Sequence, residues 1–288
     1  MLETISMNWF DFGGSGPNLH FAHANGYPPA AYTELFARLK PEYHVFASNA
    51  RPLWPDADPQ EIQDWLPMAD DLLKLIEAQP PARWIGVGHS MGATNTLRAA
   101  LHAPERFQAL VLIDPVLFPR WISLLWELIY RTGLAYRLHP LASGALRRRT
   151  EFESLAAMQA HYRQKSVFSR MDDQNLQAYI EALTQPGPDG NIHLVYPPEW
   201  EARIYVTSAR KERELWRRLP NLRPPVLLLR GAETETFFEQ TARLFKRRLP
   251  QTTLYSVPGA GHLLPLEKPG EVAAIMLEFL RSRVTPTG

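Results

Sequence analysis

The sequence predicts an α/β fold, a mostly parallel sheet with helices on both faces, interrupted by an inserted helical cap. Strand and helix patterns alternate over roughly the first 113 residues and resume after about residue 225. The stretch between them is helical in pattern and rich in Trp, Tyr, Arg and Pro. Such alternation indicates a parallel sheet covered by helices. We therefore expect a core of residues 1–115 and 216–288 and a cap, or lid, of residues 116–215.

The individual elements follow from short β-prone runs and from helical periodicity. The strand candidates are 3–12, 18–23, 43–48, 83–88, 109–113, 226–230 and 252–257. The helix candidates are 30–39, 60–79, 91–103, 237–249 and a last helix whose apolar residues 272, 275, 276, 279 and 280 share one face. Between the strands 109–113 and 226–230, a turn-prone stretch at 185–190 is the one break expected in the helical cap.

Composition excludes several classes of protein. The 31 basic and 30 acidic residues are mixed along the chain, so we expect no extended positive surface potential that would attract nucleic acid. Cysteine is absent, which excludes a thiolate nucleophile and cysteine metal sites. The first ten residues lack the apolar core of a signal peptide, so we expect a cytoplasmic protein. The apolar run 121–136 is too short to span a bilayer, and burial, or partial burial beside a pocket, is the favoured interpretation over a membrane-surface role.

The most informative motif is Gly88-His89-Ser90-Met91-Gly92, which lies between a buried strand and a helix. This context is typical of a G-x-S-x-G nucleophile elbow. A side chain two residues before or after the serine would collide with the backbone of the tight turn, so both positions hold glycine. Ser90 is the predicted nucleophile.

Two further segments extend the pattern: Leu19-His20-Phe21-Ala22-His23-Ala24-Asn25-Gly26-Tyr27-Pro28 after an early strand, and Val257-Pro258-Gly259-Ala260-Gly261-His262 after the last strand. With the elbow, they make the chain resemble the α/β-hydrolase family over nearly its whole length apart from the cap. The resemblance implies an oxyanion hole formed by the backbone N–H groups of Asn25 and Met91. The family's usual His-Gly pair is here His23-Ala24, with the glycine at Gly26.

The resemblance also implies that His262 is the general base, while His89 and His23 have structural roles. The acid is less clearly marked, because the common G-x-x-D pattern counted from Gly231 reaches Thr234. Glu235 is the predicted acid, since a capping box should open a helix at 237 and leave Glu235 at the top of the loop. Asp114, at the end of strand 109–113, is the main rival, and Glu233 is the third candidate.

These parts predict a serine hydrolase of carboxylesterase type that needs no metal and no cofactor. Ser90 attacks a carbonyl carbon, His262 takes its proton, and an acyl-enzyme forms and is hydrolysed. Phe118, Trp121, Trp126 and Tyr130 suggest an apolar substrate pocket, so a small to medium carboxylic ester is the expected substrate. An acyl thioesterase, a lipase or a C–C hydrolase would use the same triad, and a cofactor-free lyase, a peroxide-forming enzyme or a ligand-binding member of the fold remain alternatives.

Overall fold

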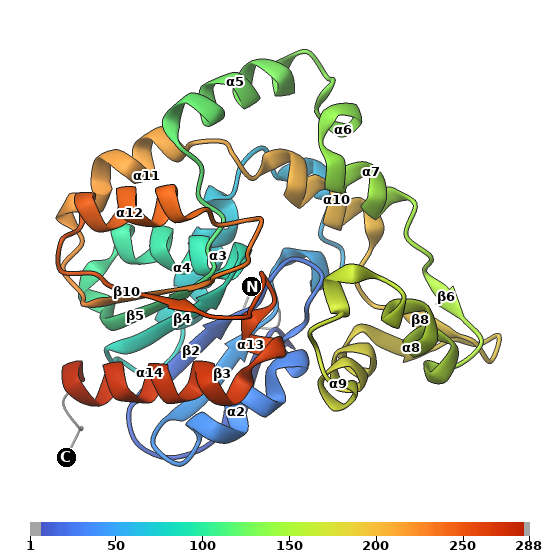
Figure 1. Ribbon diagram of the computed structural model, residues 1–288, viewed down its shortest axis with the longest axis horizontal. Coiled ribbons are helices and arrows are strands. Elements are labelled where there is room, and N and C mark those ends of the chain that lie inside the picture. Colours follow the sequence, from blue (N-terminus) through green and yellow to red (C-terminus); the bar gives the residue numbers. More distant parts are fainter. Residues whose placement is uncertain (1–6, 285–288) are drawn as a thin grey trace.

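A seven-stranded sheet forms the centre of the molecule (Figure 1) in the computed structural model, which describes residues 7–284. The strand order is β1-β3-β2-β4-β5-β9-β10, and β1 alone runs antiparallel to its neighbour. The strands are β1 (Trp9–Gly13), β2 (Asn18–Ala22), β3 (His44–Ser48), β4 (Trp84–His89), β5 (Phe107–Ile113), β9 (Val226–Gly231) and β10 (Thr253–Val257). The predicted fold class is confirmed, although the start of the first expected strand lies outside the described residues.

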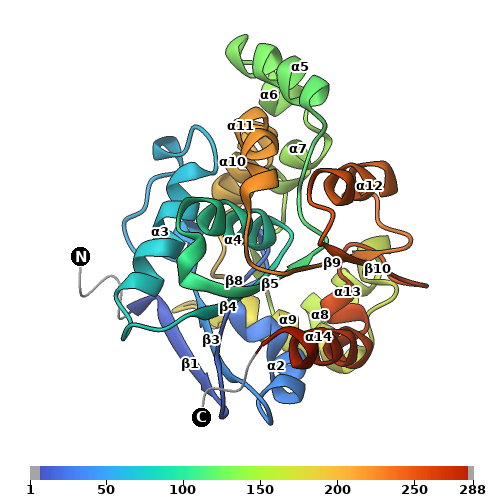
Figure 2. The ribbon, with the colours of Figure 1, turned by 90° about the vertical axis from the view of Figure 1, so that its left-hand side faces the viewer.

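Helices cover both faces of this sheet, as the two ribbon views show (Figures 1 and 2). One face carries α2 (Thr33–Leu39) and α14 (Pro269–Arg283), and the other carries α3 (Leu66–Glu77), α4 (Met91–His102) and α12 (Glu239–Arg248). Short elements complete the core: α13 (Leu264–Glu267) and 3-10 turns at Pro29–Tyr32, Arg51–Leu53, Pro59–Glu61, Pro104–Arg106 and Leu219–Asn221. Each face of the sheet therefore has its own buried cluster of apolar side chains.

The central strands are those whose sequences are continuously apolar. Every residue of β4 and β9 is buried, and β5 exposes only Gln108 in part. Parallel strands covered on both faces lose the alternation of apolar and polar residues that marks a half-exposed strand. Because β4, β5 and β9 are neighbouring parallel strands, their carboxyl ends lie side by side at one edge of the sheet.

The cap between β5 and β9 is helical with one small sheet. Its helices are α5 (Arg120–Arg131), α6 (Ala135–Leu138), α7 (Pro140–Leu146), α8 (Leu155–Arg163), α9 (Asp173–Leu183), α10 (Pro198–Thr207) and α11 (Glu212–Arg218), with a 3-10 turn at Ser166–Phe168. Three short antiparallel strands add β6 (Glu151–Phe152), β7 (Thr184–Pro186) and β8 (Ile192–Leu194). This sheet corrects the expectation of an all-helical cap. The turn-prone stretch at 185–190 folds the chain back, so that β7 and β8 form a hairpin.

A buried ion pair joins both ends of the cap to α4. Nη2 of Arg98, in α4, lies 2.9 Å from Oε1 of Glu212, and their side chains are 4% and 0% exposed. The other carboxylate oxygen of Glu212 accepts the backbone N–H of Phe118 at 3.4 Å, and Nη2 of Arg98 also donates to the carbonyl of Arg210 at 3.2 Å. The chain segments that leave and re-enter the core are thus held at one point.

We expect Glu212→Leu to lower the free energy of unfolding by about 3–5 kcal/mol, because Arg98 would stay buried without its counter-charge. Adding Arg98→Met should recover most of that loss, since an apolar pair needs no ionic partner. Urea unfolding of the two single variants and the double variant measures both effects. A cost of the single change below about 1 kcal/mol, the range of an exposed pair, would contradict this account.

Candidate active site

Three loops at the carboxyl edge of the sheet bring Ser90, His262 and Asp114 together. Nε2 of His262 lies 2.9 Å from Oγ of Ser90, and Nδ1 of the same ring lies 2.6 Å from Oδ2 of Asp114. Ser90 follows β4, Asp114 follows β5 and His262 follows β10. His89 pairs with Ile113 in the register of β4 and β5, so the serine and the aspartate leave adjacent strands at the same level. One hydrogen-bonded line therefore connects a hydroxyl, an imidazole and a carboxylate.

Ser90 lies in a strained turn, as the motif predicts. Its φ of 55° and ψ of −117° are rare for a residue with a side chain. Its N–H donates to the carbonyl of Ile113 at 2.9 Å, which holds the turn against the neighbouring strand. A Cβ at Gly92 would lie 2.1 Å from the carbonyl oxygen of Ala22, and one at Gly88 would lie 2.5 Å from the amide nitrogen of Ala93. The steric reason for both glycines is thereby confirmed.

Asp114 is fully buried and its carboxylate is surrounded by donors. Besides His262, the hydroxyl of Thr234 donates to Oδ2 at 2.6 Å and the backbone N–H of Gly231 donates to Oδ1 at 3.1 Å. The residue itself has a φ of 44°, and its own N–H donates to the carbonyl of Leu229 at 2.7 Å. A buried carboxylate needs such partners to offset the loss of water. Loops after β5, β9 and β10 all contribute to this arrangement.

The structure pairs His262 with Asp114 and not with Glu235. Glu235 is exposed, and Glu233 forms an ion pair with Arg170 of the cap. The helix expected at 237 begins two residues later, at the first residue of α12, and its N-cap makes no side-chain hydrogen bond. Thr234 instead accepts the N–H of Thr236 at 3.2 Å, and this turn leaves Glu235 at the surface.

The loop of Asn25 and Gly26, where the oxyanion hole is predicted, is held by the cap. The side chain of Asn25 donates to the carbonyl of Glu201 at 3.1 Å and accepts the hydroxyl of Tyr196 at 2.8 Å. The hydroxyl of Tyr179 donates to the carbonyl of Gly26 at 3.3 Å. Sequence reasoning missed these cap residues, and the abundance of Tyr in the cap was the one available signal. Met91, the other expected donor, is the first residue of α4, so its N–H has no acceptor within the helix.

A polar cluster of the cap lies directly over this loop. Nη1 of Arg148 is 2.6 Å from Oε2 of Glu201, and Nη2 donates to the hydroxyls of Tyr162 at 2.7 Å and Tyr179 at 2.9 Å. A Cβ placed on Gly26 would be 3.6 Å from both Nη1 of Arg148 and the carboxylate carbon of Glu201. The cap therefore presents paired charges and hydroxyls, and not only apolar side chains, beside the loop.

The other histidines near the site are structural and uncharged. Burial lowers the pKa of His23 to about 4 and holds the pKa of His89 well below its ordinary value. Nε2 of His89 donates to the carbonyl of His262 at 2.8 Å, and its Nδ1 accepts the hydroxyl of Tyr32 at the same distance. Nε2 of His23 accepts the N–H of Ala50 at 2.9 Å. His89 thus fixes the loop that carries His262.

The four aromatic residues expected to line a substrate pocket lie in different surroundings. Trp121 is 66% exposed on α5. Trp126 and Tyr130 pack against a small apolar cluster within the cap, and the indole N–H of Trp126 donates to the carbonyl of Val206 at 2.8 Å. Phe118 packs against the larger core cluster. Of the four, Phe118 packs against the core cluster, and Tyr130 reaches the core through a hydrogen bond from its hydroxyl to Gln63.

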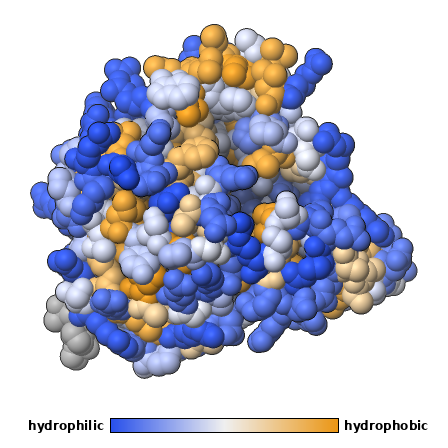
Figure 3. All heavy atoms as spheres, viewed as in Figure 1, coloured by the Kyte–Doolittle hydropathy of each residue, from blue (hydrophilic) through white to orange (hydrophobic). Residues whose placement is uncertain are grey.

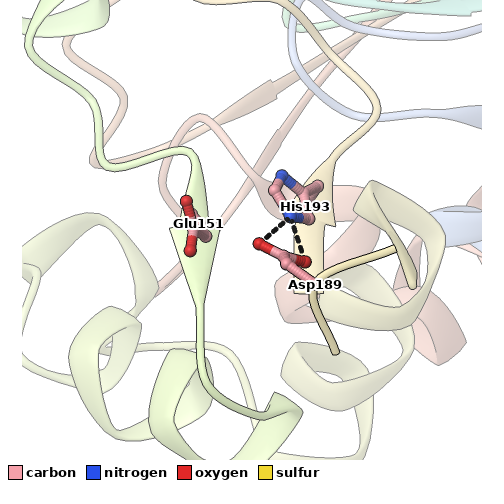
Figure 4. Close-up of side chains that lie close together, drawn as sticks. All are labelled: Glu151, Asp189 and His193. Atoms are coloured by element: carbon pink, nitrogen blue, oxygen red, sulfur yellow. Dashed lines mark hydrogen bonds and ion pairs between the residues drawn. The ribbon is translucent and has the colours of Figure 1, made fainter. Parts of the chain in front are cut away.

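Glu151, Asp189 and His193 form a cluster in the small sheet of the cap (Figure 4). One ligand atom from each lies within 4.8 Å of the others. Nε2 of His193 is 2.9 and 3.1 Å from the two carboxylate oxygens of Asp189, and this hydrogen bond lowers the pKa of Asp189 to about 2. The side-chain amide of Asn191 bonds to both acids. The groups that could bind a metal ion satisfy one another here.

Comparison with known proteins matches the chain to one family of hydrolases and to individual hydrolases. The model of the family described as "Alpha/beta hydrolase family" matches residues 21–275. "Esterase YbfF" of Escherichia coli is 23% identical over 219 residues, which cover 76% of each chain. "2-(acetamidomethylene)succinate hydrolase" of Mesorhizobium japonicum is 26% identical over 249 residues, which cover 86% of this chain and 82% of that protein. The crystal structure of E-2-(acetamidomethylene)succinate hydrolase superposes with a TM-score of 0.76 at 21% identity, covering 96% of this chain and 97% of that one.

We expect Gly92→Ala to abolish the turn geometry at Ser90 and to lower the free energy of unfolding by about 1–3 kcal/mol, as overpacking does. Gly144→Ala is the matched control. Gly144 lies within α7, and a Cβ added there would have no other heavy atom within 4 Å. That control should stabilise the protein by about 0.5–1 kcal/mol. Thermal or urea unfolding measures both, and equal stabilities for the two variants would contradict the steric account.

Proposed function

The chain belongs to the alpha/beta hydrolase family and is a hydrolase. On this premise, we propose that it is a serine hydrolase that cleaves small to medium carboxylic esters. The observation that carries the proposal is the continuous hydrogen-bonded line from Ser90 through His262 to Asp114. A hydroxyl is a weak nucleophile at neutral pH, and this arrangement activates it. Esterase and hydrolase relatives support the reaction class.

In the first half of the reaction, Ser90 attacks the ester carbonyl while Nε2 of His262 takes the hydroxyl proton. Asp114 holds Nδ1 as the protonated nitrogen and stabilises the imidazolium that forms. The tetrahedral intermediate expels the alcohol as His262 returns the proton to the leaving oxygen. Water then repeats the sequence on the acyl-enzyme and releases the acid.

The N–H groups of Met91 and Asn25 are the proposed donors to the oxyanion. A donor of this kind is worth about 3 kcal/mol when it is fixed in advance. The hydrogen bonds from the cap to Asn25 and Gly26 supply such fixation, because they limit the conformations of the loop. In this proposal Phe118 forms part of an apolar wall for the substrate.

Ser90→Ala should abolish labelling by a fluorophosphonate probe and reduce hydrolysis of p-nitrophenyl esters by several orders of magnitude, since triad members act as one unit. Peptide mass spectrometry of the labelled wild type should place the adduct on Ser90. Labelling at another residue, or full turnover in the variant, would refute the proposal. A series of ester chain lengths on the wild type then measures the size of the acyl pocket.

Asp114→Asn should lower kcat by roughly 10⁴-fold with folding intact, because the amide cannot hold the productive tautomer of His262. Glu235→Gln should have little effect on kcat, since Glu235 is exposed. Steady-state kinetics and circular dichroism of both variants test this ranking. The reverse ranking would assign the acid to Glu235.

Tyr196→Phe should lower kcat about three- to tenfold with little change in KM, because one hydrogen bond to Asn25 is worth roughly 0.5–1.5 kcal/mol. Tyr43→Phe, a buried tyrosine of the core, is the control and should leave kcat unchanged. An equal loss in the two variants would indicate a general effect of the missing hydroxyl on stability. Unchanged kcat in Tyr196→Phe would contradict the positioning role.

A further inference from the structure

The part of the cap from α5 to α7 exposes many large apolar side chains. Among residues 7–284, thirteen large hydrophobic residues are exposed, and eight of them fall between positions 121 and 146: Trp121, Leu124, Leu125, Leu128, Leu134, Leu138, Leu141 and Leu146. Figure 3 shows apolar atoms gathered over α5, at the top of that view. Scattered exposed leucines are ordinary, but a contiguous patch marks an interaction site. We call these eight residues the apolar face of the cap.

On α5 this face is a regular helical stripe. Trp121, Leu124, Leu125 and Leu128 follow the spacing i, i+3, i+4 and i+7, and they are 66, 63, 53 and 63% exposed. That spacing places side chains on one side of a helix and normally faces a core. Here it faces solvent. Full burial of this run is therefore wrong, and the helix is partly buried instead.

Contacts on the opposite side of α5 fix its orientation. Glu127 forms an ion pair with Arg210 at 2.7 Å, and the guanidinium of Arg210 lies 4.0 Å from the ring centre of Tyr130. The hydroxyl of Tyr130 donates to Gln63 of the core at 2.9 Å, and Trp126 donates to Val206. With its inner side so occupied, α5 presents the leucines outward as a built feature of the fold.

Positive charge borders this face. Exposed arginines stand along the same stretch at positions 120, 131, 137, 147 and 149. Within 120–149 the one acidic residue is Glu127, which pairs with Arg210 on the inner side and also with Arg131 at 3.1 Å. Arg149 pairs with Glu153 at 3.5 Å, so Arg120, Arg137 and Arg147 are the bordering arginines without an acidic partner in the described part of the chain. An amphipathic helix with Trp and Leu on one side and arginine around it is suited to lie in the plane of a membrane interface. Arginine pairs well with lipid phosphate, and Trp favours the headgroup level.

The charge pattern and the shape distinguish a lipid surface from a second copy of the chain. A two-fold dimer would bring the same patch of both copies together and oppose their arginines. The ribbon views place α5 at an outer end of the molecule, far from α14 (Figures 1 and 2). A projecting face on which six of the eight residues are more than half exposed fits a flat partner better than a bound peptide, which needs a groove. In the described part of the chain, no helix is long and apolar enough to cross a bilayer.

We propose that the apolar face of the cap docks the protein on the surface of a bilayer containing anionic phospholipid. The leucines and Trp121 enter the interface, and the bordering arginines contact lipid phosphates. Each arginine near an anionic leaflet increases the electrostatic attraction between protein and membrane. Salt screens this attraction and weakens the binding.

Flotation of the full chain with lipid vesicles tests the proposal. The wild type should bind vesicles with about a third phosphatidylglycerol at least tenfold more tightly than pure phosphatidylcholine vesicles. Leu124→Ser with Leu128→Ser should weaken that binding at least tenfold, as should a rise in NaCl to about 0.5 M. Arg120→Gln with Arg137→Gln should reduce the preference for anionic lipid.

Matched controls lie outside the face. Val167→Ser with Phe238→Ser removes two exposed apolar residues elsewhere, and Arg247→Gln with Arg248→Gln removes two exposed charges of α12. These controls should bind like the wild type, and all variants should keep their circular dichroism and their hydrolysis of a short soluble ester. Absence of binding to either vesicle, or equal loss in variants and controls, would overturn the proposal. So would a dimer in sedimentation velocity that only the leucine variant dissociates, which would assign the face to a second copy.

Discussion

The buried carboxylate of Asp114 is the constraint on which the site depends. With no exposed surface, it must take its hydrogen bonds from protein groups, and these come from the end of β9, the loop after β9 and the loop after β10. Gly231 is the last residue of β9, Thr234 lies in the loop after it, and His262 follows β10. Satisfying one buried charge therefore fixes the relative position of the strand ends and the direction of the imidazole. The register of β4 and β5 then places Ser90 within reach of the same ring.

The cap is part of this arrangement and more than a cover. It holds the loop of Asn25 and Gly26 through Tyr196, Tyr179 and the backbone of Glu201, while the pair of Arg98 and Glu212 ties both ends of the cap to α4. A change inside the cap can therefore alter the geometry of the proposed oxyanion hole without touching substrate. The apolar face of the cap takes no part in these hydrogen bonds or in this ion pair, so its leucines are free to make a separate contact.

The fold could be predicted from the sequence because its central strands are continuous apolar runs and its elbow has a strict steric requirement. Ser90 and His262 stand in short local motifs, and the structure brings them together. The choice between Glu235 and Asp114 could not be made locally, because it depends on which loop turns inward. Thr234 held a usable signal: it occupies the position where the common pattern has its acid, and its hydroxyl reaches the carboxylate from the neighbouring strand. The small sheet of the cap and its tyrosine contacts depend on long-range pairing, which periodicity does not reveal.

The central claim is that Asp114 orients His262, and the Nδ1 proton of His262 reports on it directly. In protein labelled with ¹⁵N-histidine, a strongly hydrogen-bonded Nδ1 proton gives a low-field proton resonance coupled to that nitrogen. The account predicts that this resonance is present in the wild type and in Glu235→Gln, and that it is lost or moves far upfield in Asp114→Asn. Its retention in Asp114→Asn together with its loss in Glu235→Gln would contradict the account.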